Sequence, residues 1–176
     1  NAMNVPILKT ERLILRGHRR DDFEAFAEIY ADPDVTRFIG GKSATREESW
    51  KRLLMIAGFW QVLGFGTWAV ELRDESRYVG YVGFGDIRRE IDPPLDGMPE
   101  GAWVLSSEVH GRGVATEAVR AALEWIDRHY HGNTTTCIID PENAASIRLA
   151  EKVGYREYAR SHYKDAKVIQ FRRQRP

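Results

Sequence analysis

The sequence predicts a single domain of mixed α/β or α+β class, and three observations support this assignment. The chain has 176 residues, a length that suits one domain able to bury roughly 70% of its unfolded surface. Segments with alternating apolar residues interleave with segments of helical period. No repeat, low-complexity tract or shift in composition divides the chain. Residues 1–2 precede Met3 and resemble the remnant of a cleaved expression tag, so residues 3–176 are treated as the domain.

The first predicted elements are a strand and a short helix. Residues 10–16 alternate around Leu13 and Leu15, as a half-buried strand does. Asp21, with Glu24 three residues later, resembles a capping box. Apolar residues then recur with helical period, and the helix should end before the next proline.

A longer helix and a hairpin follow. Thr45 and Glu48 form a second capping box, and the apolar face that begins there should stop at Gly64. Strands are predicted over 66–72 and 78–85, with a charged turn between them.

The second half of the chain opens with a long loop. Residues 88–100 are rich in proline and glycine, and loops of this length in a compact domain are usually functional or mobile. The remaining predicted elements are a strand over 101–105, a helix from Val114 that ends before Gly132, a strand over 134–139, a helix over 143–152, and strands over 156–163 and 167–173.

Composition excludes several classes of protein. Basic and acidic residues balance at 26 each, which argues against a strongly cationic surface for nucleic acid. Cys137 is the only cysteine, so an intrachain disulfide and a cysteine-clustered zinc site are excluded. No apolar run approaches the length of about 20 residues that a membrane helix needs. The expected location is the cytoplasm, and no metal site is predicted.

The most informative segment joins the strand over 101–105 to the next helix. Gly111 and Gly113 form a Gly-x-Gly turn that opens this helix. Such glycines let backbone N–H groups converge, and the helix N-terminus adds partial positive charge, which favours a bound pyrophosphate. The alternative is an ordinary permissive turn. Neither a P-loop nor a complete dinucleotide-binding glycine motif occurs in the sequence.

A second group of polar residues begins the helix over 143–152. Asn143 and Ser146 are three residues apart and share one helix face with Ala150. Short polar groups beside alanines form a narrow, hydrogen-bonding surface for a thin ligand. The alternative is an N-cap Asn followed by a solvent-facing Ser.

These segments together resemble the GNAT superfamily of N-acetyltransferases, and within it the RimJ/RimL-type enzymes. The resemblance rests on the segments 10–16, 110–115 and 143–155, which occur in that order and span nearly the whole chain. It implies a central, mixed, mostly antiparallel twisted sheet of about seven strands with four helices. It also implies an enzyme that transfers an acetyl group from acetyl-CoA to a primary amine, directly and within a ternary complex.

The resemblance assigns the cofactor-binding residues. The pyrophosphate would rest on backbone N–H groups of the 110–115 loop and the helix start, and the pantetheine arm would pair with the preceding strand. The residues so assigned are Val104, Leu105, His110, Gly111, Arg112, Gly113, Val114, Ala115, Thr116, Asn143 and Ser146. His110 stands where the family usually has Gln or Arg, and the backbone cradle does not depend on that side chain.

Three residues are candidates for catalysis. Glu100 is the expected base, acting through water on an ammonium that must lose a proton, and Asp86 and Asp165 are reserve candidates. A strand N–H near Leu105 should meet the developing oxyanion. Ser146 should assist the departing thiolate, because Ala150 occupies the position where many family members carry a Tyr.

The expected partners are acetyl-CoA and an amine acceptor, either a protein N-terminus or a small molecule. The acceptor is expected between the first two helices and the 88–100 loop, where Glu24, Glu28, Asp92, Asp96 and Glu100 suit a cation. No nucleic-acid or membrane partner is predicted, and the chain is expected to be a monomer or homodimer. The alternatives are a non-catalytic acyl-CoA-binding module and an enzyme that uses a different acyl-CoA.

Overall fold

The computed structural model describes residues 4–176, so the expected tag remnant lies outside the described residues. The strands are β1 (Leu8–Lys9), β2 (Leu13–Arg16), β3 (Thr67–Leu72), β4 (Arg77–Gly85), β5 (Glu100–Leu105), β6 (Thr134–Ile139), β7 (Arg156–Tyr163) and β8 (Ala166–Gln174). The α-helices are α1 (Phe23–Ala31), α2 (Pro33–Thr36), α3 (Arg46–Leu63), α4 (Val114–His129) and α5 (Ala144–Lys152). The described residues also contain two 3₁₀ turns, η1 (Arg20–Asp22) and η2 (Ser107–Val109).

The strands form one mixed sheet in the order β1-β2-β3-β4-β5-β6-β8-β7. Its strands run antiparallel except for β5 and β6, which are parallel and meet only at Glu100 and Thr136. The predicted fold class is confirmed, with eight strands and five α-helices in residues 4–176 where about seven and four were expected.

The two additional elements are too short to show a period in the sequence. Strand β1 has two residues and pairs Leu8 with Leu15. Helix α2 has four residues and starts at Pro33, where the missing N–H of proline costs nothing. The side chain of Asp32 caps it by accepting a hydrogen bond from the N–H of Asp34 at 2.9 Å.

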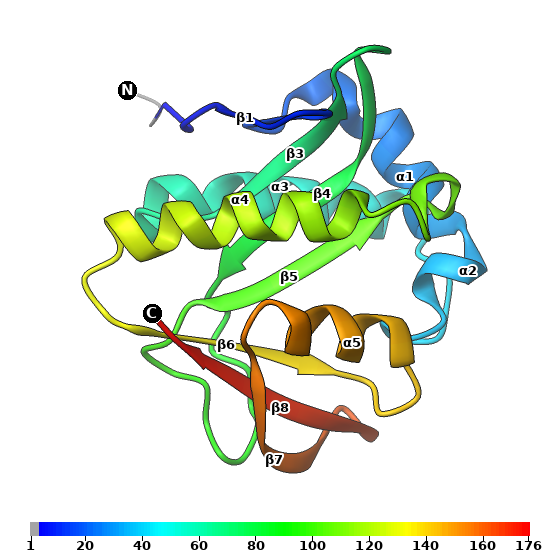
Figure 1. Ribbon diagram of the computed structural model, residues 1–176. Helices are drawn as coiled ribbons and strands as arrows, with labels where there is room; N and C mark the ends of the chain where they lie inside the picture. Colours follow the sequence, from blue (N-terminus) through cyan, green and yellow to red (C-terminus); the bar gives the residue numbers. More distant parts are fainter. Residues whose placement is uncertain (1–3) are drawn as a thin grey trace.

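Helices cover both faces of the sheet. Figure 1 shows α4 and α5 in front of the sheet, with α3 behind it. Side chains of β5 alternate between these faces: Leu105 belongs to the apolar cluster that contains α4 and α5, whereas Val104 packs with α1 and α3. The strand that leads into the Gly-x-Gly turn is thus anchored on both sides.

The two predicted capping boxes have different outcomes. Thr45 and Glu48 form theirs, with reciprocal bonds of 3.2 Å and 2.9 Å between side chains and backbone N–H groups. The first box is wrong. Asp22 accepts the N–H of Arg19 at 2.7 Å, which produces η1 ahead of α1. Glu24 instead pairs with Arg46 of α3 at 2.8 Å, a contact that local spacing does not reveal.

The 88–99 loop is held against the sheet at several points. Gln170 of β8 is fully buried and donates from Nε2 to the carbonyl of Pro93 at 3.0 Å. Tyr130 donates to the carbonyl of Gly97 at 3.2 Å. Leu95 is buried with 5% exposure. The loop therefore forms a fixed wall beside the start of β5.

Candidate active site

Strands β5 and β6 diverge from a single paired position. Thr136 donates its N–H to the carbonyl of Pro99 at 3.0 Å, next to the Glu100–Thr136 register pair. Beyond this point the two strands separate, and α5 lies in front of the widening gap (Figure 1). The edge of β5 that faces β6 therefore has backbone groups with no strand partner, which is where a substrate can pair with the sheet.

The register of β5 shows which peptide groups face this opening. Ser106 donates its N–H to the carbonyl of Val79 in β4 at 2.8 Å. Hydrogen-bonded pairs alternate in an antiparallel ladder, so Val104 shares its peptide groups with Tyr81 opposite it. Leu105 therefore directs its peptide groups toward the opening, and Trp103, two residues earlier, does the same.

Helix α4 starts without a side-chain cap. Its N-cap is Gly113, at φ +76°, and Gly111 has the same φ. This left-handed conformation favours glycine, as the Gly-x-Gly pattern predicts. The first-turn N–H groups of Val114, Ala115 and Thr116 have no acceptor within the helix. A side chain added at Gly111 would meet no atom within 4 Å, so the space before the helix is open to a ligand.

His110 turns back onto its own chain. Its Nε2 lies 3.0 Å from the carbonyl oxygen of Leu105, so Nε2 carries the proton and donates. This bond joins the end of β5 to the glycine turn. The structure thus gives the His110 side chain a local partner, and the anion cradle before α4 depends on backbone groups instead.

Helix α5 starts with a closed N-terminus. Asn143 is the N-cap, and its Oδ1 accepts the N–H of Ser146 at 3.2 Å. The hydroxyl of Ser146 is left out of this cap and lies 3.3 Å from the indole Nε1 of Trp103. Trp103 comes from β5, so this contact bridges the opening between the strand and α5. Ala150 faces inward and is fully buried.

The Trp103 contact sets the direction of the Ser146 hydroxyl. An indole N–H only donates, so the oxygen of Ser146 accepts in this bond and its hydrogen remains available for another acceptor. A hydroxyl whose oxygen already accepts a hydrogen bond is a better donor. Tyr155, buried beneath Trp103 with ring centroids 6.4 Å apart, supports the indole from below. No local pattern in the sequence predicts the Trp103–Ser146 contact, because its two members lie 43 positions apart, in β5 and α5.

Glu100 lies at the paired end of the opening. It is 9% exposed, and its two carboxylate oxygens accept from Arg89 Nε at 2.7 Å and Nη2 at 3.0 Å. The Arg89 guanidinium also lies 4.9 Å from the centre of the Tyr163 ring. Burial lowers the pKa of Arg89, but its bonds to Glu100 outweigh this and raise it overall. The cation therefore stays charged.

The candidate base and the candidate oxyanion donor are far apart. Glu100 and Leu105 occupy opposite ends of β5, a separation of about 16 Å at strand spacing. The N–H of Trp103 faces the same opening and is nearer to Glu100, so Trp103 is a candidate for the oxyanion donor beside Leu105. Asp86 bonds the N–H of Arg88 at 3.1 Å, and Asp165 is an exposed turn residue.

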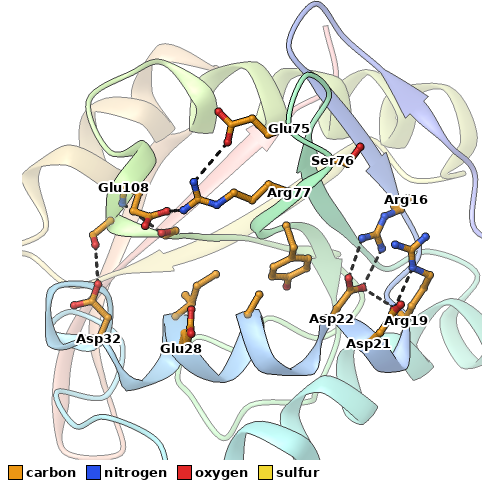
Figure 2. Close-up of a pocket in the computed structure, with 15 residues that line it drawn as sticks. Arg16, Arg19, Asp21, Asp22, Glu28, Asp32, Glu75, Ser76, Arg77 and Glu108 are labelled. Carbon is orange, nitrogen blue, oxygen red and sulfur yellow. Dashed lines mark hydrogen bonds and ion pairs between the residues drawn. The ribbon is translucent and has the colours of Figure 1, made fainter.

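A cavity of about 620 Å³ lies on the other side of the β5 end, between α1, the β3–β4 turn and residues 106–108 (Figure 2). Its lining contains six carboxylates and three guanidinium groups. Most are paired, including Arg16 with Asp22 at 2.8 Å and Asp32 with the Ser107 hydroxyl at 2.7 Å. Glu28 points from α1 toward the cavity. The negative excess disfavours phosphate groups there, so this cavity is not the cofactor site.

The expected acidic acceptor surface is only partly reproduced by this cavity. Glu28 lines it, whereas Asp92 and Asp96 belong to the 88–99 loop and Glu100 starts β5, and none of these three lines the cavity. Within residues 4–176, no group of three or more His, Cys, Asp or Glu side chains could hold a metal ion. In the same residues, no helix combines the length and apolarity needed to cross a membrane.

Comparison with known proteins decides the family. A family model described as an acetyltransferase (GNAT) domain matches residues 12–156. The chain belongs to the GNAT acetyltransferase family. It is therefore an acyltransferase, and the resemblance drawn from its three segments is confirmed. Bacillus subtilis YkkB is similar, with 30% identity over 154 residues, 84% of this chain and 83% of YkkB.

Solved structures share the whole GNAT fold. A Bordetella pertussis protein described as a GNAT-family acetyltransferase superposes with a TM-score of 0.84 at 29% identity, covering 96% of this chain and 99% of that one. RimL, a ribosomal L7/L12 α-N-protein acetyltransferase solved in complex with coenzyme A, gives 0.77 at 14% identity, covering 97% and 98%. The RimL-like architecture is thus present in this chain.

Proposed function

We propose that this GNAT enzyme transfers the acetyl group of acetyl-CoA to a primary amine by direct attack in a ternary complex. The observation that carries this proposal is the uncapped start of α4 beside the opening between β5 and β6. Backbone N–H groups at Gly113 to Thr116 suit the pyrophosphate, and the exposed edge of β5 suits the amide groups of the pantetheine arm.

The proposed binding residues follow the edge of β5 into the cradle. The carbonyl of Trp103 and the N–H of Leu105 pair with the pantetheine amides, which leaves the Trp103 N–H free for the reacting carbonyl, while Val104 holds the strand to β4. Residues 110–116 enclose the pyrophosphate through their backbone. Ser146 lies across the opening from β5, so a thioester between β5 and α5 would contact its hydroxyl.

The proposed reaction needs no covalent enzyme intermediate. The neutral amine attacks the thioester carbonyl, and the N–H of Trp103 stabilises the oxyanion. When the C–S bond breaks, its electron pair goes to sulfur; the Ser146 hydroxyl donates a hydrogen bond to the departing thiolate and relays to it the proton that the attacking nitrogen loses, so that the serine ends the step protonated. Glu100, whose carboxylate oxygens accept hydrogen bonds from Arg89, accepts the ammonium proton through water. The pair of hydrogen bonds from Arg89 restrains the Glu100 carboxylate, so water has to carry the proton from the ammonium to Glu100.

The acceptor is proposed to be an amine that is protonated, and therefore cationic, when it is free in solution. It is either a protein N-terminus or a small molecule. The negative excess around the 620 Å³ cavity attracts cations to the α1 side of the sheet. The structural likeness to RimL supports an α-amino group as the first acceptor to test. Acetyl-CoA enters from the α4 and α5 side, so the two substrates meet at β5.

Two measurements test the proposal together. Acetyl-CoA and coenzyme A should raise the melting temperature, with about 2.7 kcal/mol of added stability at 100 times the Kd. A thiol-detecting assay should then show acetyl-CoA turnover that depends on an added amine from a panel of peptides, polyamines and amino-acid-like amines. Binding without turnover would indicate a non-catalytic module, and no thermal shift at millimolar acetyl-CoA would contradict the cofactor site. Ping-pong kinetics with an isolable acetyl-enzyme would contradict direct transfer.

A further inference from the structure

The turn between β1 and β2 touches the glycine turn before α4. Arg12 donates from Nη1 to the carbonyl oxygen of Arg112 at 2.8 Å, although the two residues are 100 positions apart. Arg12 also donates from Nε to Glu117 of α4 at 2.8 Å, and its own N–H bonds the same carboxylate at 2.9 Å. Thr10 completes the contact through its hydroxyl to Glu117. The opening segment of the chain therefore packs on the proposed pyrophosphate cradle.

The bond to Arg112 controls the direction of one peptide group. The carbonyl of Arg112 and the N–H of Gly113 belong to the same planar trans peptide, so they point in opposite directions. By holding the carbonyl on the β1–β2 side, Arg12 turns the Gly113 N–H away from that side of the turn. Arg112 lies between Gly111 and Gly113, two residues with wide conformational freedom. A contact from another segment is therefore needed to fix the orientation of this peptide.

The contact between Arg12 and Glu117 neutralises a negative charge near the start of α4. Glu117 lies in the first turn of α4, where its carboxylate would repel an incoming phosphate. Burial works to raise the pKa of Glu117, but the bonds from Thr10 and Arg12 outweigh it and lower the pKa. Glu117 is therefore ionised and already paired with a guanidinium. The fixed fork of arginine allows both contacts at once, which a lysine ammonium cannot reproduce.

We infer that Arg12 is a positioning residue for the donor substrate: it orients the Arg112–Gly113 peptide and neutralises Glu117, so that the cradle before α4 is preformed for a pyrophosphate. This inference rests on the proposed acetyl-CoA site. The inference assigns a role to the segment 10–16, one of the three segments on which the family resemblance rests.

The test compares two acetyl donors with the Arg12→Met variant. S-acetylpantetheine carries the thioester and the pantetheine arm but no pyrophosphate. For Arg12→Met, kcat/KM with acetyl-CoA should fall about 10- to 100-fold, and kcat/KM with S-acetylpantetheine should stay within about twofold. Calorimetry should show the same 10- to 100-fold weakening of coenzyme A binding. Arg73→Met is the matched control, because Arg73 donates to the Thr10 carbonyl at 2.7 Å in the same turn without touching the cradle.

Each outcome decides the inference. The inference is overturned if Arg12→Met loses equal activity with both donors, because this result would indicate general damage to the turn. It is also overturned if Arg73→Met weakens coenzyme A binding as much as Arg12→Met does. Unchanged coenzyme A affinity in Arg12→Met would also overturn it while leaving the proposed function intact. If Arg12→Met does not fold, Arg12→Lys takes its place, with an intermediate loss expected for acetyl-CoA alone. Wild-type protein that fails to bind coenzyme A would contradict the proposed function itself.

Discussion

Helices α4 and α5 begin beside the same opening in the sheet, but their N-termini are built in opposite ways. At α4 the N-cap is Gly113, no side chain caps the first turn, and the space ahead is open. At α5 the N-cap Asn143 binds the N–H of Ser146 and closes the helix start. Both helices carry the same dipole, so the dipole alone does not explain an anion site.

The difference shows that a helix start becomes a binding site only when the chain leaves its N–H groups unsatisfied. Helix α4 offers backbone groups and needs glycine to expose them. Helix α5 has its N-cap on the N–H of Ser146 and offers a side chain, the hydroxyl of Ser146, which accepts a hydrogen bond from Trp103. One start therefore suits ground-state binding of the donor substrate, and the other suits the departing sulfur. Four substitutions test this division.

The largest effect is expected from Gly113→Val. Valine at φ +76° is strained, and its Cβ would lie 3.4 Å from Arg12 Nη2 in the contact that orients the turn. Coenzyme A affinity should fall on the order of 100-fold, because charge-assisted hydrogen bonds are lost along with the turn geometry. Gly64→Val is the matched control: Gly64 caps α3 at a similar φ of +80° and lies away from the cradle, so this variant should lose stability but not affinity. Unchanged affinity in Gly113→Val would place the cradle elsewhere.

Ser146→Ala should affect the chemical step alone. General acid help is worth about 10²–10⁴-fold for demanding leaving groups, and a thiolate with a pKa near 8.5 needs less, so kcat should fall roughly 10- to 100-fold. Alanine is a good helix former and the N-cap bond uses the backbone of residue 146, so the fold and coenzyme A affinity should be retained. An unaltered kcat, with chemistry shown to be rate-limiting, would remove Ser146 from the mechanism.

Trp103→Phe should have a smaller effect on the same step. The change removes the indole N–H, which donates a hydrogen bond to the Ser146 hydroxyl, and keeps most of the aromatic contact with Tyr155. One neutral hydrogen bond corresponds to about a 3- to 10-fold loss in kcat. The same change in a Ser146→Ala background should cost nothing further, because the partner hydroxyl is already absent. Additive losses in this double-mutant cycle would show that the two residues act separately.

Asn143→Ala should have the smallest effect on activity. It removes the cap of α5, so the free energy of unfolding should fall by about 1 kcal/mol. Coenzyme A affinity, measured by calorimetry, should change by less than about threefold if Asn143 serves the helix. A loss of tenfold or more would instead show that Asn143 contacts the donor substrate, as the family resemblance suggested.

Local features of the site were predictable from the sequence. The left-handed glycines at 111 and 113, the capping box at Thr45, and the position of Asn143 at the start of its helix each depend on residues within a few positions of one another. Alternation along β5 is equally local. The predicted fold class followed because these short patterns occur in an order typical of one family.

Contacts between distant segments were decided only by the tertiary structure. The Arg12–Arg112 bond, the Arg89–Glu100 pair and the Trp103–Ser146 contact each depend on sheet register and on where a helix crosses the sheet. Side-chain spacing along the chain carries no information about them. Glu24, a partner in the capping box that did not form, makes a contact of this kind as well, with Arg46 of α3. The backbone conformation of the glycine turn was therefore predictable from local sequence alone. The pairing of Glu117 with Arg12 and the orientation of the Ser146 hydroxyl depend on folding, since only folding brings the partner residues within bonding distance.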